Sequence, residues 1–257
     1  MPRVLVVVVL VVLLTRVAAA QIVNAQSALA SPPKTNGAVA SVEGKLDWRD
    51  GNNSLLDTSA TATVVVRHDR ALFLAVARAG YAESRDQVIT KKSFEHVRAR
   101  IKLDARWRWE LFGQHEYDQF RRIALRAVAG TGPALAVIDR PRGGAICGLA
   151  VMFDYERLDN RRGTIDAGKS YGSFRASAYL AGHEQLGTDA SLVQTVYVQP
   201  RFDDASAIRV LGELTLLTKL TTRIALTNSF TVSYDATPPA HIKHYDAELK
   251  VGAVVSF

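Results

Sequence analysis

The sequence predicts an all-β fold: a closed antiparallel up-and-down transmembrane β-barrel of about twelve strands, which follows a cleaved signal peptide. Three observations support this prediction. Apolar and polar residues alternate over most of the chain, many of the alternating segments are longer than ordinary strands, and the one long apolar run lies at the amino terminus. Sustained alternation indicates a strand with one face in an apolar medium and the other in a polar one.

Residues 1–20 have the composition of a secretory signal peptide. A basic residue, Arg3, precedes eleven consecutive Val and Leu residues, and small residues follow up to Ala20. The apolar run is shorter than the roughly 20 residues of a membrane-spanning helix, which makes a membrane anchor the weaker alternative. Cleavage after Ala20, or as late as residue 25, fits the small residues there. We expect a flexible segment over 21–36 and the barrel over 37–257.

Twelve alternating segments follow the leader. The last is the clearest, because every odd position from Tyr245 to Phe257 is apolar or aromatic and most even positions are polar. Short polar connections such as 104–106 predict turns at one end of the barrel, and longer ones such as 83–92 predict loops at the other. The segments are 38–49, 56–67, 71–82, 93–104, 107–118, 120–131, 144–157, 170–181, 190–199, 205–217, 222–234 and 243–257.

Charged residues on the polar faces predict which face lies inside. Burying them in a soluble sandwich core would be prohibitive without partners, so they face a wet lumen or each other. A soluble periplasmic barrel, with the two faces exchanged, also fits the alternation and stays open. The residues predicted to line the lumen are Arg98, Arg100, Glu110, Glu116, Arg122 and Arg126.

Odd and even positions of a strand face opposite sides of the sheet, and this parity also predicts which charged residues lie opposite each other across two turns. Across the turn at 104–106, Arg100 lies opposite Glu110. Across the next turn, Glu116 lies opposite Arg122. We predict a salt bridge within each pair, because a slip of one residue would move these charges into lipid.

Several classes of function find little support in the sequence. A single cysteine, Cys147, excludes an internal disulfide framework and a thiolate metal site. The six histidines lack metal-ligand spacing, and the net charge of +7 is mild for nucleic-acid binding, so we predict no metal, no cofactor and no nucleic-acid partner. His115, Glu116 and Asp118 lie close in sequence, but His115 has the opposite parity, so we expect Asp118 to cap a corner and predict no catalytic residues.

The segments 93–135 and 233–257 resemble a known bacterial family, the salt-induced outer membrane proteins, also catalogued as domain of unknown function 481. They contain a strand, a short turn, an aromatic strand, a Tyr-Asp-x-Phe corner at 117–120 and a Gly-x-Gly-Pro stretch at 130–133. The resemblance implies an outer-membrane barrel without assigned catalytic residues. The terminal Phe257 is similar to the signal that the barrel-assembly machinery reads.

We therefore expect a non-enzymatic barrel of the bacterial outer membrane, porin-like or related to envelope and salt stress. Its expected partners are outer-membrane lipid, the assembly machinery and small solutes or ions, and we expect a monomer. An arginine-rich lumen would favour anions if it conducts, or would act as a plug of paired charges if it does not. A closed-lumen structural or binding barrel is the first alternative, and an outer-membrane hydrolase is the second.

Overall fold

The computed structural model describes residues 33, 35–50 and 54–256, and every regular element within them is a β-strand. The predicted signal peptide with its cleavage site, most of the predicted flexible segment, and Phe257 lie outside the described residues. No helix long and apolar enough to span a membrane occurs in the described part of the chain. The strands are β1 (Gly37–Arg49), β2 (Leu55–His68), β3 (Ala71–Ser84), β4 (Gln87–Lys102), β5 (Trp107–Asp118), β6 (Ile123–Arg140), β7 (Gly143–Leu158), β8 (Ser170–Leu186), β9 (Ala190–Gln199), β10 (Arg209–Lys219), β11 (Ile224–Asp235) and β12 (Tyr245–Ser256).

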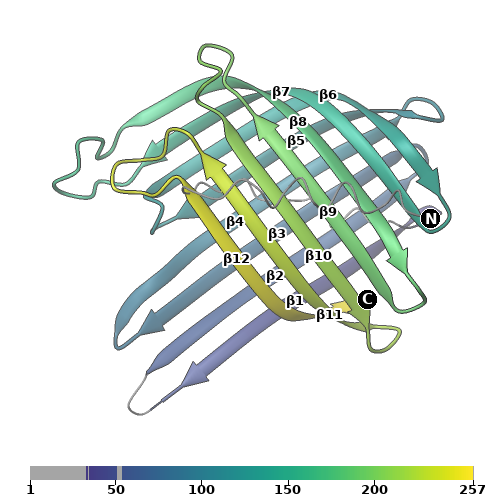
Figure 1. Ribbon diagram of the computed structural model, residues 1–257, viewed down its shortest axis with the longest axis horizontal. Coiled ribbons are helices and arrows are strands. Elements are labelled where there is room, and N and C mark those ends of the chain that lie inside the picture. The colour runs from purple at the N-terminus through teal and green to yellow at the C-terminus, as the bar shows by residue number, and fades with distance from the viewer. Residues whose placement is uncertain (1–32, 34, 51–53, 257) are drawn as a thin grey trace, which may run out of the picture.

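The twelve strands form one closed antiparallel barrel, shown in Figure 1. Each strand pairs with its neighbours in sequence, and β1 pairs with β12 to close the sheet. The predicted fold class is therefore confirmed, including the number of strands and their up-and-down order.

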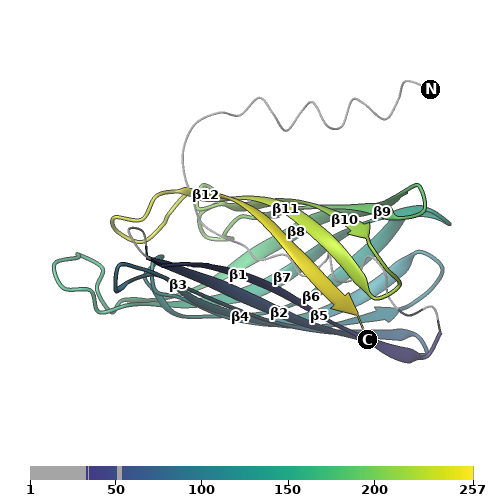
Figure 2. The same cartoon turned by 90° about the horizontal axis from the view of Figure 1, so that it is seen from below.

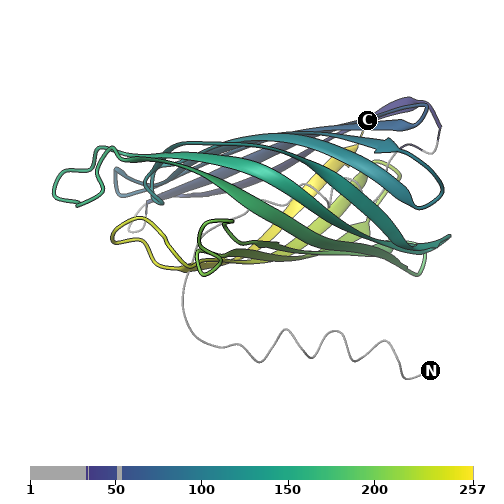
Figure 3. The same cartoon turned by 90° about the horizontal axis from the view of Figure 1, so that it is seen from above.

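The two ends of the barrel differ in their connections, as Figures 2 and 3 show. At the end where β1 begins and β12 ends, here called the turn end, neighbouring strands are joined by short turns such as 69–70 and 141–142. The opposite end, here called the loop end, has the long connections 159–169, 200–208 and 236–244. This asymmetry is the one that transmembrane barrels show between periplasmic turns and external loops.

One predicted loop at this end is wrong. Residues 83–92 form the ends of β3 and β4, joined by a two-residue turn at Arg85 and Asp86. Both residues take the left-handed backbone conformation, with φ of 50° and 60°, as such tight hairpin turns require. The polar composition of this stretch therefore reflects a hairpin tip and not a loop.

Side chains alternate across the barrel wall, with apolar groups outside and charged groups inside. Phe73, Val97 and Leu111 are exposed on the outer surface, whereas Arg98 and Glu110 are buried inside. An apolar exterior of this extent is unfavourable in water and favourable in hydrocarbon. The arrangement excludes the soluble barrel with exchanged faces, and the protein is a membrane-embedded barrel.

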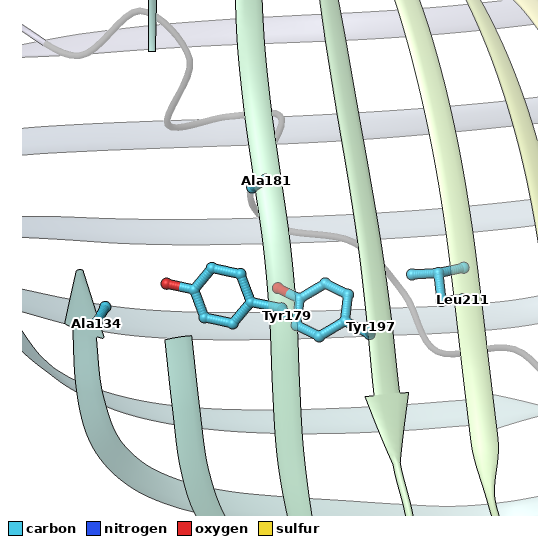
Figure 4. Close-up of a cluster of buried hydrophobic side chains, with 5 residues drawn as sticks. All are labelled: Ala134, Tyr179, Ala181, Tyr197 and Leu211. Carbon is cyan, nitrogen blue, oxygen red and sulfur yellow. The ribbon is translucent and has the colours of Figure 1, made fainter. Parts of the chain in front are cut away.

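A small apolar core fills part of the lumen. Tyr179 of β8 and Tyr197 of β9 lie side by side, with ring centroids 5.4 Å apart, between Ala134 of β6 and Leu211 of β10 (Figure 4). All four residues are buried. This packing fills lumen space next to β6–β10, and it places the Tyr179 hydroxyl within hydrogen-bonding distance of Arg100 on β4 and Glu110 on β5.

Candidate functional site

Glu110 of β5 is the centre of a buried network near the turn end of the lumen. Its Oε2 accepts hydrogen bonds from Arg98 Nη1 and from Tyr179 Oη, both at 2.9 Å. Its Oε1 accepts from Arg100 Nε at 2.6 Å. The Arg98 guanidinium also lies over the Phe112 ring, 5.0 Å from its centroid. Both oxygens of this carboxylate are therefore bonded, and the network connects β4, β5 and β8.

Glycines on the intervening strands make the contact between Tyr179 and Glu110 possible. Tyr179 lies on β8, and its hydroxyl crosses β7 and β6 to reach Glu110. A Cβ on Gly148 of β7 would lie only 2.2 Å from Cε1 of Tyr179. Gly132 of β6 is the direct strand partner of Glu110 and adds no side chain between them. Gly148 therefore provides the space that the tyrosine ring occupies, whereas a Cβ on Gly132 would meet the backbone of β7 at Leu149 O, 2.1 Å away.

A second set of buried charges, here called the loop-end cluster, joins β5 to β11. Asp154 of β7 is at its centre, accepting from Arg126 Nε at 2.9 Å and from Arg209 Nη1 at 2.7 Å. The Nε of Arg175 lies 3.2 Å from the same carboxylate. Arg209 also donates to Asp235 at 2.6 Å. The cluster consists of Glu116, Arg121, Arg126, Asp154, Glu156, Arg175, Arg209 and Asp235.

The loop-end cluster contains four arginines and four carboxylates and is formally neutral. Each arginine therefore has its counter-charge in direct contact, which offsets the desolvation cost of burial. Its arginines therefore connect strands through ion pairs. Because their charge is neutralised by these carboxylates, they attract an anion in the lumen only weakly.

Arg122, which parity placed in the lumen, instead holds two loops at the loop end. Its fully buried guanidinium donates to Asp159 at 2.9 Å, to Asp166 at 2.5 Å and to Thr164 at 2.8 Å, all in the 159–169 connection. It also donates to the carbonyl of Ala240, in the 236–244 connection, at 3.0 Å. Arg122 is therefore a loop anchor.

The predicted salt bridge between Glu116 and Arg122 is wrong. Glu116 binds Arg121 at 2.6 Å and Arg126 at 3.2 Å. The ladder between β5 and β6 shifts register next to Asp118, and Arg122 has a left-handed φ of 62°, so the alternation of faces does not continue through the corner. The other predicted salt bridge, Arg100 to Glu110, is confirmed at 2.6 Å.

The other predicted lumen residues lie on inward-facing positions and are buried or nearly so: Arg98, Arg100, Glu110, Glu116 and Arg126. Residues that the sequence analysis did not single out are as central to the network. Asp154 and Glu156 share the inward parity of the 144–157 segment, and Arg175 has the inward parity of 170–181. Charges at those positions were a usable signal. Tyr179 gave none, because an inward tyrosine and an outward one look alike in sequence.

Open space remains on the opposite side of the lumen, in a cavity of about 420 Å³. It is lined mainly by β1–β4 and β9–β12, with inward hydroxyls such as those of Thr215, Ser229 and Thr231. Among its described lining residues, acidic side chains outnumber basic ones even without Glu116, which is already bonded to two arginines. The acidic ones are Glu43, Asp57, Glu116, Asp118, Glu213 and Glu248, and the basic ones are Lys45, Arg78, Lys92 and Lys250.

The groups considered for catalysis do not assemble. His115 faces outward and contacts Glu95 at 2.5 Å, and both side chains are about half exposed. Glu116 faces inward, and Asp118 caps the following turn by accepting from the N–H groups of Phe120 and Arg121, each at 3.0 Å, as predicted. Within the described residues, no group of His, Cys, Asp and Glu has the arrangement of a metal site.

Comparison with solved structures gives distant likenesses to barrels. The translocator domain of the autotransporter NalP from Neisseria meningitidis aligns with a TM-score of 0.48 and 12% identity, over 90% of this chain and 92% of that one. The NanC porin aligns with a TM-score of 0.46 and 9% identity, over 84% and 98%. The KdgM porin aligns with a TM-score of 0.42 and 10% identity, over 86% and 99%.

No curated protein matches the sequence. A family model described as protein of unknown function, DUF481, matches residues 46–257, which include all of the barrel except the start of β1. The chain belongs to this family.

Proposed function

We propose that this protein is a narrow, non-enzymatic channel of the bacterial outer membrane, which passes small hydrophilic solutes and weakly prefers cations. The observation that supports this most directly is the cavity beside β1–β4 and β9–β12, which is lined by hydroxyls and has an excess of carboxylates. Side chains alone fill an eight-stranded barrel, whereas twelve strands enclose more space than the buried network occupies. The remaining space offers a polar path along one wall.

The expected preference for cations follows from where the charges lie. The arginines that made an anion pathway plausible are bonded to carboxylates in the opposite wall. Fixed charge next to the path sets the local ion concentration, and that charge is slightly negative. An ion path of this kind also fits the salt-stress role that the family resemblance implies. In this proposal the barrel acts as a monomer and reaches the membrane through the assembly machinery.

Conductance in planar bilayers under a KCl gradient tests the proposal. We expect a reversal potential between zero and the equilibrium potential of K⁺, as for a weakly cation-selective channel. The double variant Glu213→Gln, Glu248→Gln removes two carboxylates from the cavity lining. Apart from Glu116, which is bonded to two arginines, three carboxylates then remain against four basic groups, and the reversal potential should shift towards the value for anion selectivity. Glu95→Gln, on the outer surface, is the matched control and should leave it unchanged. A wild-type preference for anions would contradict the proposed path.

A closed-lumen structural barrel is the second candidate, favoured by the buried network and by the loops that Arg122 holds together. In this case neither ions nor uncharged sugars cross. Liposome swelling in a small sugar, measured beside conductance, separates the two candidates: swelling with no measurable ion current indicates an uncharged solute path, and the absence of both favours the closed barrel.

A further inference from the structure

The seam between β1 and β12 is the weakest joint of the barrel wall. All thirteen residues of β1 pair with β2, but only Ser41–Gly44 pair with β12, through Ala253–Ser256. β12 pairs with β11 along nearly its whole length, from Tyr245 to Val255. Both strands therefore continue as regular β-structure beyond the point where their mutual pairing stops.

The unpaired edges run toward the loop end. If the register of the seam continued, Lys45 would pair with Gly252 and Trp48 with Leu249. In the described residues the ladder stops before these pairs, and Figures 1 and 2 show the β1–β2 hairpin and β12 diverging toward the loop end. The result is a wedge-shaped opening in the side of the barrel.

A side-chain hydrogen bond between β11 and β1 lies where the two edges begin to separate. Thr227 of β11 donates to Oε1 of Glu43 on β1 at 2.7 Å, across β12. The contact crosses β12 at Gly252, where a Cβ would lie 2.9 Å from the same oxygen. Glycine at this position therefore lets the Glu43 side chain reach past β12 and hold the two edges together where they begin to separate.

Exposed apolar side chains flank the opening on the outer face, as expected for a part of the wall that contacts hydrocarbon. Leu46 and Trp48 on the β1 side are 71% and 70% exposed, and Leu249 and Val251 on the β12 side are 70% and 57% exposed, all on the outer face. Open sheet edges in hydrocarbon are costly, because lipid cannot satisfy their backbone groups. The unpaired backbone groups of these edges therefore need hydrogen bonds from water or from polar side chains of the lumen. The opening is then a boundary between the hydrated lumen and the lipid.

The lumen cavity is continuous with the opening. Its lining includes Lys45 and Asp57 on one side of the opening and the stretch from Glu248 to Gly252 on the other. A molecule seated here would place one part against Leu46 and Leu249 in the lipid and another part among the hydroxyls and charges of the cavity. Only an amphiphile satisfies both surroundings.

We propose that the seam between β1 and β12 is a lateral gate, which admits an amphiphile with an acyl chain from the outer leaflet into the lumen. The acyl chain lies between the outward apolar residues of the two edges, and the polar head lies in the cavity. This inference depends on the membrane embedding of the barrel and is independent of whether the lumen conducts ions.

Disulfide crosslinking in lipid vesicles tests whether the seam is open. In a Cys147→Ser background, the control variant Val42→Cys, Val255→Cys joins two residues that are paired in the seam. The test variant Leu46→Cys, Val251→Cys joins two residues that would pair only if the seam were closed. We expect the control to crosslink at least about tenfold faster under a membrane-permeant oxidant, because unpaired edges lie beyond disulfide reach. Equal rates would overturn the open seam.

A photoactivatable palmitic acid analogue in the same vesicles tests the occupant. We expect labelled peptides from both edges of the opening and from inward residues such as Thr61, which pairs with the inward Glu43 and lines the cavity. Linking the Leu46→Cys, Val251→Cys pair with a bismaleimide should abolish the inward labelling and leave the labelling of Leu149, on the far outer wall, unchanged. Uniform labelling of outward residues alone would refute the gate. If the opening instead crosslinks to a second copy of the protein or to residues 21–36, that segment is its occupant and the proposed gate for an amphiphile is also refuted.

Discussion

Neutralising Glu110 should destabilise the barrel more than neutralising any exposed carboxylate. The Glu110 side chain is 3% exposed, and its partner Arg98 is 4% exposed. Glu110→Gln leaves Arg98 and Arg100 next to each other without a counter-charge. Breaking a buried ion pair in this way costs about 3–5 kcal/mol. We expect a value of about 3 kcal/mol, near the lower end of that range, because the amide oxygen keeps one acceptor and Arg100 has some access to water.

The free energy of unfolding can be measured in lipid vesicles by guanidinium titration, followed through tryptophan fluorescence. Glu95→Gln is the matched control. It also removes a carboxylate in contact with a basic side chain, but this pair is about half exposed and should cost at most about 1 kcal/mol.

Two outcomes decide whether the reasoning is right. If Glu110→Gln and Glu95→Gln destabilise the barrel equally, the lumen around Glu110 is wet and the buried network does not hold the wall. If the network is dry, the double variant Arg98→Met, Glu110→Leu should be more stable than Glu110→Gln alone, because an apolar pair costs less than an unpaired buried charge.

Two further predictions concern the wall and the loops. Gly148→Ala should cost about 1–3 kcal/mol in the same titration, because its Cβ would lie 2.2 Å from Tyr179, whereas Gly212→Ala, with nothing within 4 Å, should have little effect. In the loop anchor, burial raises the pKa of Asp166, but the hydrogen bonds from the Ala240 N–H and from the Arg122 guanidinium outweigh it, and the pKa lies below its ordinary value. The stabilisation of the loop anchor by Asp166 is therefore fully present above the ordinary carboxyl pKa and is lost as the pH falls through the lowered one. The protection of the Ala240 amide relative to its intrinsic exchange rate, measured by mass spectrometry, should decrease at a pH below that ordinary value. Asp166→Asn should show this reduced protection already at neutral pH, and unchanged protection would contradict the anchor.

Strict alternation made much of the fold predictable. The twelve strands, the inward face and the register between β4 and β5 all follow from a period of two, and the contact of Arg100 with Glu110 follows from that register. These features depend only on local parity, which persists as long as the ladder has no irregularity.

Parity stops being informative where the backbone leaves the ladder. The left-handed backbone at Arg85 makes a tight hairpin turn where the sequence analysis predicted a loop over 83–92. The left-handed backbone at Arg122 and the register shift beside Asp118 move Arg122 away from Glu116, which was its predicted partner. Contacts across several strands are also beyond a local pattern. The approach of Tyr179 to Glu110 depends on the curvature of the whole sheet, which no short segment specifies.

The buried side chains described above also suggest an order of assembly. Those of the Glu110 network and the loop-end cluster come from β4 to β11, and among the described residues β1, β2, β3 and β12 contribute none of them. The curved sheet from β4 to β11 can therefore acquire its internal core before its outer edges meet. We expect this part to form the folding nucleus and the closing strands to dock last, which would leave the final joint the easiest to reopen.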